Sequence, residues 1–115
     1  MANDCTFCRI ARGEIPARIV YQDALITAFH DARPQAPTHI LVIPNHHVPS
    51  LNHTTEEDTL LLGQMLAVAR DLAVEHGLSD GGYRLVLNTG RNGGQSVFHM
   101  HLHVLGGRRM TWPPG

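Results

Sequence analysis

Three histidines near the C-terminus alternate with apolar residues in the segment His99-Met100-His101-Leu102-His103. Side chains alternate between the two faces of a β-strand, so an exposed strand here would place the three imidazoles on one face, roughly 6.5–7 Å apart. Met100 and Leu102 would then point into the core. Such a row of imidazoles could bind a metal ion. It could instead be catalytic, with one neutral imidazole attacking an electrophile and its neighbours orienting it.

A glycine-rich loop over residues 89–96 comes directly before the histidines. Consecutive backbone N–H groups of such a loop can bind a phosphate. A phosphate held by Gln95 and Ser96 would lie beside His101, where an imidazole could attack phosphorus. Ser96 could also pass a proton to the leaving group. Asn88, before the loop, is either a further neutral donor or an ordinary turn residue. The order of loop and histidines therefore favours phosphoryl chemistry.

Composition excludes several classes of function. The chain has 115 residues and 12.7 kDa, with 43% hydrophobic and 17% charged residues, which indicates a folded domain with its own core. The formal net charge is -1 and no block of like charge occurs, so we expect no nucleic-acid partner. No apolar run approaches the roughly 20 residues of a membrane span. We expect no membrane association.

The basic residues and the N-terminus narrow the chemistry and the compartment. All nine basic residues are arginines, so a lysine Schiff base is impossible and a nucleophile is expected among histidine, serine and cysteine. Residues 1–4 have neither a basic nor an apolar region of a signal peptide. We expect a cytoplasmic protein.

These side chains are expected to be positioned by one α+β domain over residues 1–115, with a mostly antiparallel five-stranded sheet. The long helix is predicted from Thr54, where Thr54 and Glu57 fit a capping box, to Gly77. The pattern also predicts a short helix over 5–12 and strands over 19–21, 25–30, 39–43, 83–88 and 97–105.

The long helix is expected to bury one apolar face, made of Leu62, Met65, Leu66, Ala69, Leu72 and Ala73. Three further apolar residues widen this surface beyond one stripe: Leu60, Ala67 and Val74. A second covered face, as in a dimer, and a merely apolar helix explain these residues equally well.

The histidine segment matches the motif that defines the histidine triad (HIT) family. Further segments make the chain resemble the Hint branch of that family: Ala28-Phe29-His30-Asp31, Pro34-Gln35-Ala36-Pro37-Thr38-His39, Leu41-Val42-Ile43-Pro44, Gly94-Gln95-Ser96-Val97 and Trp112-Pro113-Pro114-Gly115. The resemblance covers nearly the whole chain. It implies a HIT-like fold and a homodimer that hydrolyses the P–N bond of purine nucleoside 5′-phosphoramidates and releases the nucleoside monophosphate.

The resemblance also implies roles for single residues. His101 matches the nucleophile, which forms a covalent nucleotidyl-imidazole, and His103 a residue that contacts the phosphate and the bridging atom. His39 and His99 match residues that fix the tautomer and orientation of the nucleophile. Trp112, in the tail over 105–115, matches a residue that reaches the partner subunit's site. The phosphate site would consist of Asn88, Gly94, Gln95 and Ser96, and the ribose and base site of Asp31, Phe7, Ile10, Phe29, His30 and Ala32, of which Ala32 departs from a larger aliphatic residue.

Two cysteines form the motif Cys5-x-x-Cys8, which allows redox chemistry, metal binding or two free thiols. Zinc requires two more ligands. The resemblance to bacterial members implies a structural zinc site of Cys5, Cys8, His47 and His99, with His46 as an alternative ligand. Catalysis itself is expected to need no cofactor.

Three other functions remain open. The chain could cleave dinucleoside polyphosphates, although Ser96 and the Trp112-Pro113-Pro114-Gly115 tail favour a phosphoramidate. It could bind purine nucleotides without turnover. It could also be a metalloenzyme that holds its metal on the three histidines, in which case a chelator would abolish activity.

Overall fold

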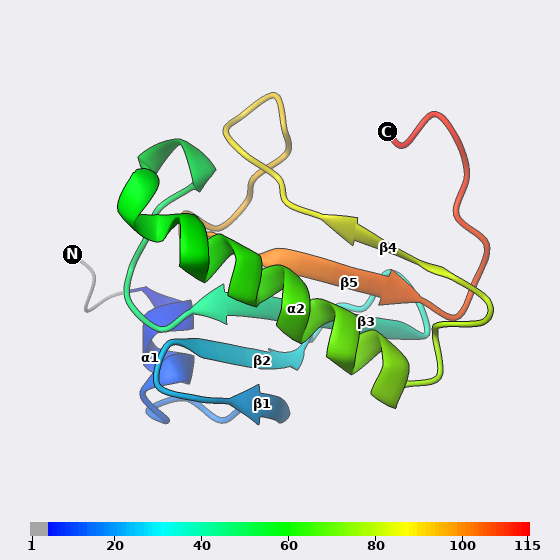
Figure 1. The fold of residues 1–115 in the computed structure, drawn as a ribbon, viewed down its shortest axis with the longest axis horizontal. Coiled ribbons are helices and arrows are strands. Elements are labelled where there is room, and N and C mark those ends of the chain that lie inside the picture. The colour runs from blue at the N-terminus through cyan, green and yellow to red at the C-terminus, as the bar shows by residue number, and fades with distance from the viewer. Residues whose placement is uncertain (1–4) are drawn as a thin grey trace.

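The computed structural model describes residues 5–115, and the expectation about a signal peptide lies outside these residues. Two helices and five strands make up the fold (Figure 1). The helices are α1 (Thr6–Ala11) and α2 (Thr59–Glu75), and the strands are β1 (Ile19–Gln22), β2 (Ile26–His30), β3 (Thr38–Pro44), β4 (Tyr83–Val86) and β5 (Leu102–Gly106). None of the helices within residues 5–115 has both the length and the apolar character that crossing a membrane requires.

The five strands form one antiparallel sheet, as predicted, and they are arranged in the order β1-β2-β3-β5-β4. β3 lies at its centre and is almost wholly buried. Its pairing with β5 places His39 opposite Leu105 and Leu41 opposite His103. Two histidines from distant parts of the sequence therefore enter the same region of the sheet.

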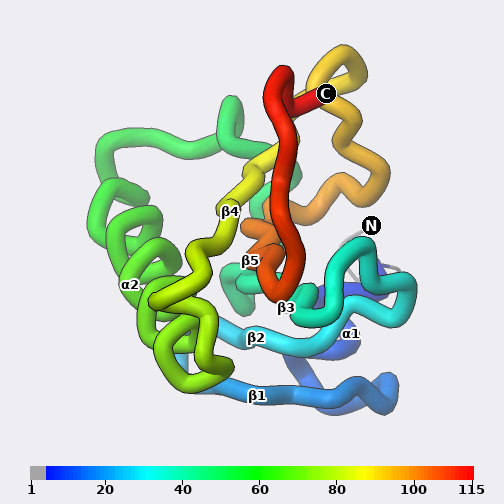
Figure 2. Tube along the Cα trace, turned by 90° about the vertical axis from the view of Figure 1, so that its right-hand side faces the viewer, coloured from blue at the N-terminus to red at the C-terminus, as the bar shows by residue number. Residues whose placement is uncertain are grey.

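The two helices cover opposite faces of the sheet (Figures 1 and 2). α2 packs on one face over the larger core, which includes Ile40, Val42, Met100, Leu102 and Val104. The expected inward orientation of the apolar residues between the histidines is therefore confirmed. α1 packs on the other face over a smaller cluster of Phe7, Ile10, Phe29, Leu41 and Ile43.

The start of the long helix was predicted wrongly. Two short 3-10 turns, Leu51–His53 and Glu56–Asp58, come before α2. Thr54 does not cap the helix because its hydroxyl donates to the Leu51 carbonyl, 2.7 Å away. The capping box is formed one residue later by Thr55 and Asp58. The C-terminal end at Gly77 is as expected, with this glycine in the left-handed region at φ 71°.

The buried face of α2 also differs in part from the prediction. The buried residues of α2 are Leu61, Met65, Ala69, Leu72 and Ala73. Of the residues expected on this face, Leu62 is only partly buried and Leu66 is 53% exposed. Leu60 and Val74, in the possible second face, are 72% and 61% exposed in the single chain. An apolar surface therefore remains uncovered along this helix.

The predicted strand over 97–105 was too long, since β5 begins only at Leu102. Its neighbour β3 ends at Pro44, which has no N–H, and the Pro44 carbonyl accepts from the His99 ring instead of from a strand. The strand predicted over 83–88 likewise ends at Val86. His99 and His101 therefore lie before the strand, and the simple alternation of three histidines on one exposed face is wrong.

Candidate functional site

A cavity of about 860 Å³ opens on the α1 side of the sheet. It brings together side chains from α1, β2, β3, β5 and the glycine-rich loop. Of the residues predicted to form the site, it is lined by Phe7, Ile10, Phe29, His30, Asp31, Ala32, His39, Ser96, His101 and His103. Its size suits a ligand as large as a nucleotide.

The protonation of His101 is determined by one backbone carbonyl. Nδ1 of His101 lies 2.7 Å from the carbonyl oxygen of His99, which can only accept, so Nδ1 carries the proton and donates. In the neutral ring Nε2 then holds a free lone pair. The ring is buried and packs edge-on against Phe7, with ring centroids 5.2 Å apart. These contacts thus hold the His101 ring in one orientation on the wall of the cavity.

A backbone N–H determines the tautomers of two further histidines. The Gln35 N–H donates to Nδ1 of His39 over 3.0 Å, so the proton of neutral His39 is on Nε2. That Nε2 lies 2.8 Å from Nδ1 of His103 and donates to it. The proton of neutral His103 is therefore on its Nε2, which is buried without a hydrogen-bond partner among residues 5–115. A donor at the cavity is thus left for a ligand.

The surroundings of His103 and His39 favour their neutral forms. Burial, together with the nearby His101 and His39 and against Asp31, lowers the pKa of His103 to about 4. Burial also lowers the pKa of His39, although Asp31 raises it. Ring centroids of His101 and His103 are 4.9 Å apart. The Nε2 lone pair of the neutral form of His101 would therefore lie beside the Nε2–H donor of His103.

Gln95 supports the glycine-rich loop instead of lining the cavity. Its amide Nε2 donates to the carbonyls of Pro49 and Val97, at 2.7 and 3.1 Å. Its Oε1 accepts from the Gly90 N–H at 3.0 Å. The backbone N–H of Gln95 donates to the Gly90 carbonyl. The side-chain amide and the backbone N–H of Gln95 are therefore both bonded to other protein groups. Ser96 is the loop residue that lines the cavity, next to Val97.

Three other predicted residues lie outside the lining of the cavity in this chain. Asn88 follows β4 and is partly buried, and Gly94 is an exposed turn glycine at φ 79°. Trp112 is 80% exposed. In the single chain, the Trp112 indole is not part of the lining of the cavity. The site that it is expected to reach belongs to the partner subunit.

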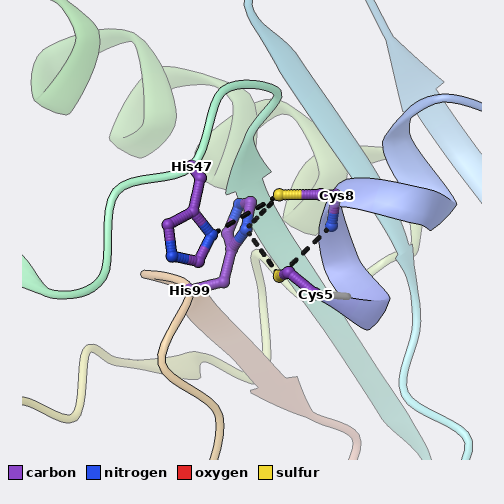
Figure 3. A group of neighbouring side chains, drawn as sticks. All are labelled: Cys5, Cys8, His47 and His99. Carbon is purple, nitrogen blue, oxygen red and sulfur yellow. Dashed lines mark hydrogen bonds between the residues drawn. The ribbon is translucent and has the colours of Figure 1, made fainter. Parts of the chain in front are cut away.

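The ring of His99 faces away from the cavity, toward Cys5, Cys8 and His47 (Figure 3). The four potential ligand atoms lie within 4.8 Å of one another. Nδ1 of His99 is 3.3 Å from Sγ of Cys5 and 3.4 Å from Sγ of Cys8, and Nδ1 of His47 is 3.4 Å from Sγ of Cys8. These four side chains are close enough to bind one metal ion.

The chemistry of this donor set fits zinc. Ligands at ~2.3 Å for sulfur and ~2.05 Å for nitrogen give a tetrahedral S···N edge of about 3.5 Å, close to the distances found. Nε2 of His99 donates to the Pro44 carbonyl at 2.8 Å, so Nδ1 presents its lone pair to the cysteines. Burial lowers the pKa of His99 to about 4, which keeps that lone pair available. His46 is exposed and is outside the cluster.

The metal-binding group and the cavity share parts of the chain. α1 carries Cys8, and Cys5 caps its first turn, while Phe7 and Ile10 of the same helix line the cavity. His99 faces the cysteines with its ring and holds His101 with its carbonyl. Binding of a metal would thus fix one wall of the cavity and the orientation of His101.

Asp31, His39 and His103 also lie close enough together to hold a metal. A ligand nitrogen must present a lone pair, however, and Nε2 of His39 carries a proton because the Gln35 N–H occupies Nδ1. Nδ1 of His103 is used to accept that proton. The hydrogen bonds therefore favour a proton-donating role for these histidines over a metal-binding one.

Sequence analysis missed the contribution of Gln35, which acts through its backbone N–H. No side-chain pattern signals such a role, since any non-proline residue supplies this donor. It also missed Arg18 and Arg33, which line the cavity. Within residues 5–115, these two arginines carry the only lysine or arginine charges on the wall of the cavity. The expectation of an anionic ligand was the one reason to look for such residues in the sequence.

Comparison with known proteins agrees with this architecture. The HIT domain model matches residues 12–110. A purine nucleoside phosphoramidase of Escherichia coli K12 is 53% identical over 108 residues, which cover 94% of this chain and 91% of that protein. The crystal structure of a HIT family hydrolase from Legionella pneumophila Philadelphia 1 is 55% identical, with a TM-score of 0.95 over 97% of this chain and 100% of that one. A histidine triad protein from Clostridium difficile is 41% identical, with a TM-score of 0.91 over 94% of both chains. The chain belongs to the HIT domain family.

Proposed function

We propose that this protein hydrolyses purine nucleoside 5′-phosphoramidates, cleaving the P–N bond through a covalent nucleotidyl-histidine. The observation that carries the proposal is the complementary pair of tautomers, a free Nε2 lone pair on His101 beside a free Nε2–H on His103. Phosphoryl transfer needs chiefly positioning and stabilisation of charge, which such fixed groups supply. The similarity to a purine nucleoside phosphoramidase supports the same substrate class.

The first step joins the nucleotide to His101. Its Nε2 attacks the α-phosphorus, the P–N bond breaks, and the amine leaves with the electron pair of that bond and a proton that the Ser96 hydroxyl relays from solvent. The Nε2–H of His103 donates to a phosphoryl oxygen as charge develops there. Water then attacks the same phosphorus, the P–Nε2 bond breaks, and the nucleoside monophosphate leaves. The water that attacks in this second step returns one proton to solvent. One water is consumed for one amine and one monophosphate released.

The rest of the cavity would hold the nucleoside. The Asp31 carboxylate, partly buried and held by the Arg33 N–H over 2.8 Å, would accept hydrogen bonds from the ribose hydroxyls. The base would pack among Phe7, Ile10, Phe29 and His30, where the two phenyl rings already make an edge contact at 5.5 Å. Ala32 leaves this wall less bulky than a larger aliphatic residue would.

The test is hydrolysis of adenosine 5′-phosphoramidate in the presence of EDTA, by the wild type and by His101→Ala. We expect turnover by the wild type and a loss of at least about 10³-fold in the variant, as for removal of other nucleophiles. His46→Ala, which removes an exposed histidine, is the control and should retain full activity. Loss of wild-type activity in EDTA with recovery on added zinc would instead indicate a metalloenzyme. Faster cleavage of a dinucleoside polyphosphate, or tight AMP binding without turnover, would also overturn the proposal.

We further propose that Cys5, Cys8, His47 and His99 bind a structural zinc ion. The bound ion would supply a crosslink between α1, the segment after β3 and the residues before His101, and it would leave the reaction to the histidines. Metal analysis of the purified protein should give one zinc per chain. A Cys5→Ser, Cys8→Ser protein should lose the zinc and melt at a lower temperature, and equal melting temperatures would contradict the proposal.

We also propose that the protein is a homodimer, with the exposed apolar residues of α2 in the interface and the tail bearing Trp112 directed at the partner's site. The exposure of Leu60, Leu66 and Val74 in one chain supports this assembly. The cytoplasm remains the expected compartment.

A further inference from the structure

The segment between β2 and β3, residues 31–37, forms one side of the cavity without belonging to a helix or strand. Two of its residues, Pro34 and Pro37, have no N–H with which to fix it. Inside the segment, the Arg33 N–H donates to the Asp31 carboxylate and the Gln35 side-chain amide donates to the Arg33 carbonyl. The backbone N–H of Gln35 is held from outside the segment, by His39. This matters because the Gln35 N–H determines the tautomer of His39.

The other side of Gln35 is held by the chain that follows β5. Nε of Arg108 donates to the Gln35 carbonyl over 3.0 Å. The same guanidinium donates through Nη1 to the Arg109 carbonyl, 3.1 Å away. Arg108 makes no ion pair with a carboxylate among residues 5–115. Its donors are used to join two stretches of backbone.

Close packing next to Arg108 fixes the same two stretches. Gly107 has φ 90°, and a Cβ added to it would lie 2.9 Å from Cβ of Pro37. The chain can approach the 31–37 segment this closely only because this residue is glycine. Arg108 is therefore presented to Gln35 from a backbone that is itself tightly placed.

We propose that Arg108 is a positioning residue for the reaction. By holding the Gln35 carbonyl, Arg108 fixes the backbone conformation of Gln35, and this conformation keeps the Gln35 N–H on Nδ1 of His39. His39 in turn keeps its Nε2–H on His103. The start of the C-terminal tail thus acts on the active site of its own chain, separately from the contact proposed for Trp112 with the partner. The effect on turnover rests on the proposed phosphoramidase activity, whereas the effect on the tautomers does not.

The test uses three variants of the full-length protein. Arg108→Ala removes the donor. Arg108→Gln removes the charge but places an amide nitrogen at the same bond position as Nε, so it can restore the hydrogen bond to Gln35. Arg109→Ala removes a neighbouring exposed charge whose side chain makes no hydrogen bond within residues 5–115, and it serves as the matched control.

Two measurements separate positioning from general stability. Nitrogen-15 spectra of labelled histidines report which ring nitrogen is protonated, and we expect Nε2–H for His39 and His103 in the wild type. In Arg108→Ala these signals should move toward a mixture of tautomers. With phosphoramidate, kcat should fall about three- to tenfold while KM changes less than about twofold, because the lost contact orients reacting groups. Arg108→Gln should recover most of kcat, and Arg109→Ala should resemble the wild type.

The proposal is overturned if Arg108→Ala leaves the histidine signals unchanged, or if Arg109→Ala alters them equally. Failure of Arg108→Gln to recover while it remains folded would show that charge, not the Gln35 hydrogen bond, is what matters. If Arg108→Ala does not fold, Arg108→Met, which keeps the length of the side chain but has no donor, takes its place in the comparison with Arg108→Gln. Absence of wild-type turnover would refute the proposed activity alone, since the tautomers are read without substrate.

Discussion

At the scale of single residues, the site depends on backbone groups that can each make only one kind of hydrogen bond. A carbonyl can only accept and an N–H can only donate, so the His99 carbonyl and the Gln35 N–H fix the protons of three imidazoles. No charged partner is needed for this. The lone pair of His101 and the proton of His103 are consequences of where two peptide groups point.

Gln95 offers a test of how the glycine-rich loop is held. Gln95→Ala would leave the Gly90 N–H and the carbonyls of Pro49 and Val97 without this partner, and we expect the free energy of unfolding to fall by about 1–3 kcal/mol. KM for the phosphoramidate should rise because Ser96 loses its support. Urea unfolding and steady-state kinetics measure both effects. Gln64→Ala is the control, since Oε1 of Gln64 has no hydrogen-bond partner within residues 5–115. Equal loss of stability in the two variants would contradict the prediction.

The sequence predicted which residues take part in the site better than it predicted where their side chains point. Alternation along the chain correctly indicated that Met100 and Leu102 enter the core. It could not show that His99 turns toward the cysteines, because that depends on Pro44 ending the neighbouring strand. Likewise, the presence of a glutamine at position 95 does not show that its amide donates to the carbonyl of Pro49, 46 residues away in the chain.

At the scale of elements, α1 is short but has two tasks. One turn presents Cys8 to the metal-binding group, and the same helix presents Phe7 and Ile10 to the cavity. A helix of six residues has little stability of its own, so its tertiary contacts must hold it. The zinc site proposed above would supply such a contact.

Binding of zinc by this group should depend on pH. Burial raises the pKa of the Cys8 thiol to about 11, and a hydrogen bond with Cys5 contributes, so the metal-free thiol is protonated at pH 7. Because zinc binds the thiolate, binding must release this proton, and affinity should fall about tenfold for each proton released per unit decrease in pH. Competition with a chromogenic chelator between pH 6.5 and 8 measures the slope. His46→Ala should keep the slope, and an affinity independent of pH would contradict the prediction.

Element types were predicted well and their ends less well. The apolar runs and the glycine after each helix identified both helices and all five strands. The N-terminal end of α2 was wrong because Thr54 bonds back to Leu51, Thr55 caps a separate 3-10 turn over Glu56–Asp58, and α2 begins only at Thr59. Two adjacent threonines have nearly equal capping ability, so only the geometry of the preceding turn decides between them.

At the scale of the whole molecule, the outer surface of α2 is apolar and uncovered in the single chain. α2 leaves Leu60, Leu66 and Val74 exposed, and we expect a second copy of the chain to cover them. Light scattering should give twice the 12.7 kDa of one chain. A Leu60→Glu, Val74→Glu protein should be monomeric, whereas Leu25→Glu, at an exposed residue before β2, should remain dimeric. A monomeric wild type would contradict the prediction.

Two buried histidines should make the metal-free protein sensitive to acid. Burial lowers the pKa of both His99 and His103 to about 4 in the folded state, whereas their unfolded value is near 6.5. Between these values the unfolded chain binds more protons than the folded chain, so acid favours unfolding. The full stability is present above pH 6.5 and is lost as the pH falls toward 4.

Urea unfolding of the EDTA-treated protein between pH 4 and 7.5 tests this. Each of the two histidines should lower the free energy of unfolding by at most about 1.4 kcal/mol per pH unit, and their contribution should become shallower as the pH approaches 4. His103→Gln removes one of the groups and should give a shallower slope than the wild type, while His46→Ala, an exposed site, should not change it. A free energy that stays constant from pH 6.5 to pH 4 would mean that these rings accept protons without unfolding, and the proton of His103 would then no longer be confined to Nε2.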